Sequence, residues 1–136
     1  MVPTLHDKDW LIISDLFYEP EQGDIVVLTK KAFMEQPIVK RVIAVEGQVI
    51  DIDFDKGVVW VDGVALNEPY IAEKTKRQFD FKFPAKVPED CVFVMGDNRM
   101  HSSDSRVASL GMVDKRYILG RVLFRIYPFN QIGTVG

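Results

Sequence analysis

The sequence predicts a mostly-β fold of twisted antiparallel sheets, arranged as a partly open barrel core with a small β insertion. Two observations lead to this prediction. Short runs rich in β-branched residues recur in both halves of the chain, whereas segments with helical periodicity are scarce. The middle of the chain, residues 47–86, is more polar than its flanks. We therefore expect residues 1–46 and 87–136 to form the core and residues 47–86 to form the insertion.

Each predicted strand follows from a short apolar or alternating run. In chain order, the predicted strands are 10–14, 25–28, 37–45, 48–54, 58–61, 64–66, 91–95 and 121–127. The run 48–54 alternates apolar and acidic residues, which predicts one buried and one exposed face. Between 58–61 and 64–66 stand Asp62 and Gly63, a two-residue signal for a type I′ turn, so these two strands are expected to form a hairpin.

One helix is expected, at Asp114–Leu119. Asp114 is a suitable N-cap for it, and Gly120 stands where a helix commonly ends. Residues 73–82 interleave charged residues with phenylalanines, and they are expected to form a surface loop or an edge strand.

Composition excludes several classes of function. The length of 136 residues suits one domain, and the 47% of hydrophobic residues is enough for a core. The net charge of −3, with acids and bases interspersed, argues against a nucleic-acid-binding protein. The single cysteine, Cys91, and the two histidines argue against a structural zinc site, so we expect no metal and no cofactor. No run of 18 apolar residues is present that would span a membrane.

Lys40 is the first candidate for chemistry. It lies in the longest apolar run, where strand alternation places Ile38, Val42 and Ala44 on its face and Ile43 on the opposite face. Burial among apolar neighbours disfavours the ammonium form and lowers the pKa of a lysine, so a neutral Lys40 amine is a candidate general base. The simpler alternative is a lysine that extends its stem along the strand and keeps its amine in water.

The second candidate is the polar segment Gly96–Arg106. Its eleven residues include three serines, two aspartates and two arginines. Groups this polar must pair with one another if the loop is buried. The alternative is a solvated loop with weak surface ion pairs. His101 lacks the strand–turn–helix setting of a nucleophile elbow and is expected to be exposed, whereas Cys91 is expected in the core.

Four segments, taken in order, resemble the motifs of bacterial type I signal peptidases. Met1–Leu5 is similar to the end of the S-M-x-P-T-L motif, and Gly23–Val27 to the strand motif that follows it. Val39–Gly47 resembles the lysine motif, and Gly96–Arg106 resembles the G-D-N-R-x-x-S-x-D-S-R motif, the most specific of the four. The resemblance extends along nearly the whole chain, and the short insertion is similar to that of Gram-positive members.

The resemblance implies the signal peptidase fold and a serine endopeptidase with a Ser/Lys dyad, which removes N-terminal signal peptides from exported preproteins. In that chemistry Lys40 would be the general base, and Ser102 would orient its amine. The resemblance also implies two supporting pairs, Asp104 with Arg106 and Asp97 with Arg41.

The same motifs place the nucleophilic serine directly before the residue that matches Met1. Thr4 matches the motif's own threonine, and Ser14, Ser103 and Ser105 occupy other positions of the pattern. We therefore expect this chain to be an excised catalytic part that lacks the serine and cannot cleave peptides. The full protein is expected to carry the serine and a single membrane anchor upstream of Met1, with the catalytic domain on the extracytoplasmic side of the cell membrane.

Exported preproteins present small residues before the cut, in an A-x-A-like site. An extended peptide can add to an exposed strand edge, and we expect that edge at residues 37–40. The expected substrate-binding residues, which would wall small apolar pockets, are Met1, Leu5, Pro37, Ile38 and Val39.

Two alternatives remain from other functional classes. The first is a catalytically silent homologue that acts as a binding or assembly factor for exported proteins. The second is a generic β-barrel ligand module, which would have a closed pocket away from Lys40 and a solvated Lys40 amine. Retention of Lys40 and Ser102 favours the peptidase, because a silent homologue has no need for a lysine among apolar residues.

Overall fold

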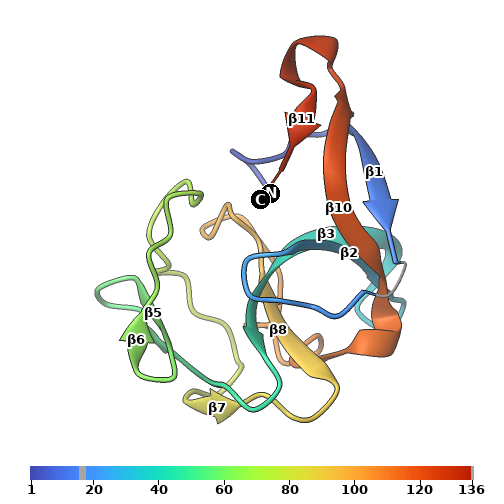
Figure 1. Cartoon of the computed structure of the whole chain (residues 1–136). Helices are drawn as coiled ribbons and strands as arrows, with labels where there is room; N and C mark the ends of the chain where they lie inside the picture. The colour runs from blue at the N-terminus through green and yellow to red at the C-terminus, as the bar shows by residue number, and fades with distance from the viewer. Residues whose placement is uncertain (16–17, 136) are drawn as a thin grey trace.

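The computed structural model, which describes residues 1–15 and 18–135, is built on two antiparallel sheets (Figure 1). The elements, in chain order, are β1 (Trp10–Ser14), β2 (Ile25–Lys30), β3 (Met34–Val45), β4 (Val49–Asp53), β5 (Val58–Val61), β6 (Val64–Ala65), β7 (Ala85–Lys86), β8 (Cys91–Met95), β9 (Val113–Asp114), η1 (Lys115–Tyr117), β10 (Ile118–Tyr127), η2 (Phe129–Gln131) and β11 (Gly133–Thr134). The two 3₁₀ helices have three residues each, and no helix in the described part of the chain is long and apolar enough to cross a membrane.

The larger, seven-stranded sheet has the order β1-β10-β2-β3-β8-β9, with β11 paired to β10. The smaller, four-stranded sheet has the order β6-β5-β4-β7, and its labelled strands lie at the lower left of Figure 1. The larger sheet takes its strands from both ends of the chain, and the smaller one takes all of its strands from residues 49–86. The strands of the described residues do not close into a barrel, and the predicted mostly-β, antiparallel class is confirmed.

The hydrophobic core joins the two sheets. One cluster of buried side chains draws on both of them: Ile43, Ala44, Ile50, Ile52, Val59, Val61, Val87, Phe93 and Met95. Full burial of such side chains stabilises the fold by about 1.5–3 kcal/mol each. The smaller sheet therefore packs on a core that it shares with the larger sheet.

All eight predicted strands are present, and the predicted hairpin is confirmed. Asp62 and Gly63 have φ values of 50° and 77°, the positive values that a type I′ turn requires. Strands β7, β9 and β11 were not predicted, because they have two residues each, too few to show a period of two. Strand β6 is equally short, and only the Asp62-Gly63 turn before it made it predictable.

The expected helix at Asp114–Leu119 is wrong. Asp114 does cap a turn by accepting the Arg116 backbone N–H at 2.9 Å, but that turn is only the 3₁₀ helix η1. Ile118 then begins β10, where it lies opposite Leu28 of β2 and packs against a buried cluster. Tertiary packing thus overrides the local helix signal. Gly120 lies inside β10, where a Cβ would come within 3.0 Å of the Ser14 carbonyl oxygen.

The predicted alternation along β3 holds only in part. Ile38 and Val42 pack into one cluster as expected, but Ile43 and Ala44 both belong to the cluster between the sheets. The register with β8 shifts between Val42 and Ala44, so Ile43 is an extra residue on the β3 side. Such a β-bulge turns the following side chains to the opposite face.

Candidate active site

Lys40 lies where the pairing of β3 changes. From Ile38 to Lys40 the strand pairs with β2, and the pairing with β8 begins only at Arg41, opposite Met95. Beyond Met95 the chain leaves the sheet as the segment 96–106. The β3 edge that would face β8 is therefore unpaired by any described strand at residues 37–40, directly beside the Lys40 side chain.

A chain of hydrogen bonds begins at the Lys40 amine. Its Nζ donates to the Ser102 Oγ at 2.8 Å, and the Ser102 hydroxyl donates to the Asp104 Oδ2 at 2.9 Å. A hydroxyl has one hydrogen to give. Because Ser102 gives it to Asp104, it can only accept from Lys40, and the lone pair of a neutral Lys40 amine stays available for another proton donor.

The electrostatics shift Lys40 toward its neutral form and keep the neighbouring aspartate charged. Burial lowers the pKa of Lys40, the Asp104 charge opposes this, the Arg106 charge lowers it further, and the net pKa lies below the usual lysine value. Burial raises the pKa of Asp104, but hydrogen bonds and charge from Arg106, together with the Gly96 N–H, outweigh it, so the pKa of Asp104 falls below its usual value. Asp104 is therefore a carboxylate at neutral pH.

Arg106 holds the loop together from within. Its side chain is fully buried, and it donates to both carboxylate oxygens of Asp104, at 2.9 and 3.0 Å. The remaining N–H groups reach the backbone carbonyls of Arg77, Arg99 and Ser102, at 2.9, 2.9 and 3.3 Å. One guanidinium thus fixes the shape of the loop that presents Ser102 to Lys40.

A second buried pair joins β3 to the start of the same loop. Arg41 donates to the two carboxylate oxygens of Asp97 at 2.9 and 2.8 Å, and to the Gly23 carbonyl at 3.0 Å. The Thr4 hydroxyl also donates to Asp97, which ties the N-terminal segment to the loop. The Tyr70 ring lies 3.8 Å from the Arg41 guanidinium, a favourable cation–π distance.

Gly96 allows the loop to close on Lys40. A Cβ at this position would lie 2.2 Å from the Ser102 Oγ and 3.4 Å from the Lys40 Nζ. Any side chain would therefore displace the Ser102 hydroxyl from the position in which it accepts from Lys40.

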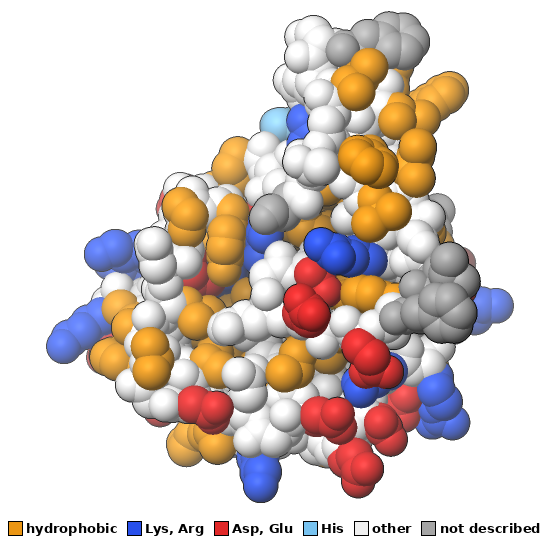
Figure 2. Space-filling view, in the orientation of Figure 1, with side chains coloured by type: hydrophobic (Ala, Val, Ile, Leu, Met, Phe, Trp, Pro, Cys, Tyr) orange, Lys and Arg blue, Asp and Glu red, His pale blue; other side chains and the backbone are white. Residues whose placement is uncertain are grey.

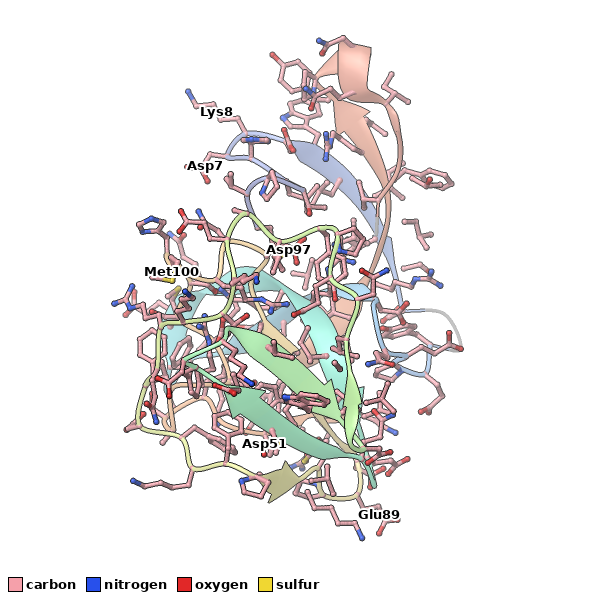
Figure 3. The ribbon with its side chains drawn as sticks, turned by 90° about the vertical axis from the view of Figure 1, so that its left-hand side faces the viewer. Asp7, Lys8, Asp51, Glu89, Asp97 and Met100 are labelled. Atoms are coloured by element: carbon pink, nitrogen blue, oxygen red, sulfur yellow. The ribbon has the colours of Figure 1, made fainter. Side chains whose placement is uncertain are left out.

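A cleft of about 900 Å³ opens over these groups. Six of the predicted residues line it: Met1, Leu5, Ile38, Val39, Lys40 and Ser102. The predicted residue Pro37 is exposed and does not line it. His101 is exposed at its rim, as predicted. In Figure 3, Asp7 and Lys8 of the N-terminal turn lie above Met100 of the loop, on the same side of the molecule.

Comparison with known proteins decides the family. A family model described as "Signal peptidase, peptidase S26" matches residues 1–127. The chain belongs to this signal peptidase family. "Probable signal peptidase I-1" of a Synechocystis species is 37% identical over 147 residues, which cover 100% of this chain and 71% of the relative. "Signal peptidase I S" of Bacillus subtilis is 36% identical over 143 residues, which cover 97% of this chain and 74% of the relative.

A solved structure agrees with this assignment. The signal peptidase I of Enterococcus faecalis V583 superposes with a TM-score of 0.63 at 27% sequence identity, over 76% of this chain and 97% of that one. The family resemblance predicted from the sequence motifs is therefore confirmed, together with the fold class.

Sequence reasoning missed several residues around the signal peptidase motifs. Gly96 and Arg99 lie inside the most specific motif, but nothing local shows that one abuts Ser102 and the other is fully buried. Glu68, Tyr70 and Thr75 come from the insertion, which has no periodic signal there. Within residues 1–15 and 18–135, no group of three His, Cys, Asp or Glu side chains is placed to hold a metal.

Proposed function

We propose that this chain is the catalytic part of a serine endopeptidase that removes N-terminal signal peptides from exported preproteins, with Lys40 as its general base. The observation that carries the proposal is the partly buried Lys40 amine, whose pKa is lowered and which donates to Ser102 inside a cleft. The motifs and the signal peptidase relatives supply the reaction class.

The proposed nucleophile is a serine that directly precedes Met1. Two features support this place for it. Met1 and Lys40 line the same cleft. The Asp97 N–H donates to the Met1 Sδ at 3.4 Å, and Gly96, directly before Asp97, lies against Ser102 and Lys40. Lys40 would take the serine proton as the oxygen attacks the scissile carbonyl, and would then pass that proton to the leaving amine.

The unpaired β3 edge at residues 37–40 is the proposed docking strand for the signal peptide. Backbone hydrogen bonds along this edge would hold the peptide extended, and side chains would enter pockets on alternate positions. Leu5 and Val39 belong to one cluster and line the cleft with Ile38. These apolar walls would accept the small residues that precede the cut and exclude large ones.

We place the domain on the extracytoplasmic surface of the cell membrane, held by a single anchor upstream of Met1. An apolar surface on β1 and β10 supports contact with a bilayer, and Figure 2 shows hydrophobic side chains gathered on that side. Trp10 is 63% exposed, Phe124 is 44% exposed, and both lie on these paired strands. The Trp10 and Tyr127 rings lie 5.6 Å apart, and such aromatic pairs favour the membrane interface.

The nucleophile can be tested by extending the chain. A chain with serine before Met1 should cleave a preprotein at its signal peptide, and the same chain with alanine there should not. Cleavage is followed by electrophoresis and the product N-terminus is sequenced. Cleavage by neither chain would refute the proposed nucleophile. If both still bind the preprotein, the result would instead support the silent binding homologue.

The proposed membrane-contacting surface on β1 and β10 can be tested separately. Trp10→Ser with Phe124→Ser should reduce binding of the chain to phosphatidylglycerol–phosphatidylcholine vesicles by about tenfold or more, since each change removes an exposed apolar side chain. Co-sedimentation with the vesicles measures the bound fraction. Val64→Ser, on the other sheet and 66% exposed, is the matched control. Equal losses in all variants would contradict a docking face on β1 and β10.

A further inference from the structure

Residues 68–81 of the insertion, which we call the strap, run along the loop that carries Ser102. Apart from the bonds that Arg99 makes, five hydrogen bonds join the strap to residues 97–108. They are Ala72 N–H to the Asp97 carbonyl (3.2 Å), Arg77 Nη1 to the Met100 carbonyl (3.0 Å), Arg106 Nη1 to the Arg77 carbonyl (2.9 Å), Phe81 N–H to the Arg106 carbonyl (3.0 Å) and Ala108 N–H to the Asp80 Oδ1 (2.8 Å). The insertion thus braces the loop along its length.

Arg99 of the loop makes a fully buried contact with the strap. Its side chain is fully buried, and Glu68 accepts from its Nη2 at 2.5 Å while Thr75 accepts from its Nη1 at 2.8 Å. Its Nε donates to the Gly96 carbonyl at 2.8 Å. A buried guanidinium must be paired and hydrogen-bonded, and both of the side chains that bond Arg99 come from the strap.

The Gly96 backbone transmits this contact to the site. Arg99 donates to the Gly96 carbonyl, and the Gly96 N–H donates to the Asp104 Oδ2 at 3.1 Å. That same oxygen accepts the Ser102 hydroxyl. Because Gly96 leaves no space for a Cβ beside the Ser102 Oγ, a shift of Gly96 must move Ser102 relative to Lys40.

We propose that Glu68 and Thr75 are positioning residues for the reaction, which act through Arg99 and Gly96 to keep the Ser102 hydroxyl in register with the Lys40 amine. Neither residue lines the cleft, so neither touches substrate. The inference rests on the proposed function, because it assigns these residues to the Lys40 base. It gives the insertion a role in the reaction beyond filling the core.

Thr75→Val is the sharpest test, because it removes only the hydroxyl that accepts from Arg99 and keeps the shape of the side chain. Loosening of the loop lets water reach Lys40. Since burial is the largest cause that lowers the pKa of Lys40, this pKa should rise in the variant. Nuclear magnetic resonance titration of the lysine side chains in the 136-residue chain measures it, with Lys40→Arg to assign the signal.

In a chain with serine before Met1, Thr75→Val should lower kcat by about 10- to 100-fold, the size that a misplacement of about 1 Å can cost. KM should be unchanged, and the acid limb of the pH–rate profile should move to higher pH. Thr75→Ser keeps the hydroxyl and should keep both kcat and the acid limb of the pH–rate profile at their original values. Glu68→Gln keeps an acceptor for Arg99 but loses the charge. It should also lower kcat and move the acid limb to higher pH, and it serves as the test variant if Thr75→Val fails to fold.

Gln48→Met is the matched control, since it removes a partly buried side-chain bond to the Val45 N–H at the far end of β3. It should lower stability without moving the Lys40 titration. An unchanged Lys40 titration in Thr75→Val and Glu68→Gln would overturn the positioning role and leave the proposed function standing. An ordinary lysine pKa at Lys40 in the unaltered chain would instead overturn the proposed function.

Discussion

Replacing Lys40 by methionine should reduce kcat/KM for a signal-peptide substrate by about 10²–10⁴-fold or more, measured in a chain with serine before Met1. Methionine keeps most of the volume of the lysine stem but cannot take a proton. The serine hydroxyl would then lose the partly buried amine that lies against Ser102, and Asp104 cannot replace it because it is already bonded to Ser102 and Arg106. Initial rates of cleavage of a fluorogenic peptide measure the loss.

The same substitution should not weaken the fold at neutral pH, and this separates chemistry from stability. The folded pKa of Lys40 lies below its usual value, so between these two pKa values the unfolded chain binds more protons than the folded chain. The stability of the unaltered chain must therefore rise with pH through that window. Lys40→Met lacks this dependence, and urea unfolding at pH 7 and at pH 10 compares the two.

Lys30 offers a matched control for the rate measurement. Its amine donates to the Leu110 carbonyl, and the residue lies outside the cleft, so Lys30→Met should keep its rate within a few-fold of the unaltered chain. A Lys40→Met chain that cleaves at a similar rate would exclude Lys40 as the base.

Replacing Arg106 by methionine should lower the free energy of unfolding by about 3–5 kcal/mol at neutral pH, because it leaves the Asp104 charge buried without its partner. Both side chains are fully buried in the pair. The backbone carbonyls of Arg77, Arg99 and Ser102 also lose a donor. Urea unfolding at pH 7, followed by circular dichroism, measures the change.

The loss of unfolding free energy in Arg106→Met should be smaller in acid, because protonation removes the charge of Asp104. With Arg106 present, the pKa of Asp104 is below its usual value, so the pair stabilises the fold above that value and loses this effect as pH falls through the folded pKa. Without Arg106, burial raises the pKa of Asp104, so the variant becomes more stable relative to the unaltered chain as pH falls toward about 4. A deficit that is equal at pH 7 and pH 4 would contradict a charged buried Asp104.

Two further variants sharpen this test. The double variant Asp104→Asn with Arg106→Met should recover part of the loss, because it leaves no unpaired buried charge. Arg116→Met should change the free energy of unfolding little, since the Arg116–Asp114 pair is largely exposed.

Local signals predicted the parts of this fold that depend on neighbouring residues. The Asp62-Gly63 turn could be predicted because positive φ values are a local steric requirement, which these two residues meet. Strand β8 could be predicted because its apolar run is buried on both faces. The helix at Asp114–Leu119 could not be corrected from the sequence, because the partner of Ile118 is Leu28, ninety positions away.

The candidate site also contains residues that local signals could predict and residues that they could not. Lys40 and the segment Gly96–Arg106 could be selected from motif spacing and residue type. The arrangement of Glu68 and Thr75 around Arg99 could not be predicted, because these residues lie 31 and 24 positions before Arg99 in the chain.

By itself, the sequence determined the signal peptidase family, the β class and the residues that form the Lys40–Ser102–Asp104 chain. Only the tertiary structure decided that Gly96 lies against Ser102 and that the insertion braces the loop through Arg99. The physical reason is that motif spacing and backbone sterics act between near neighbours, whereas burial, and the pairing that burial forces on a charge, depend on which distant segments meet.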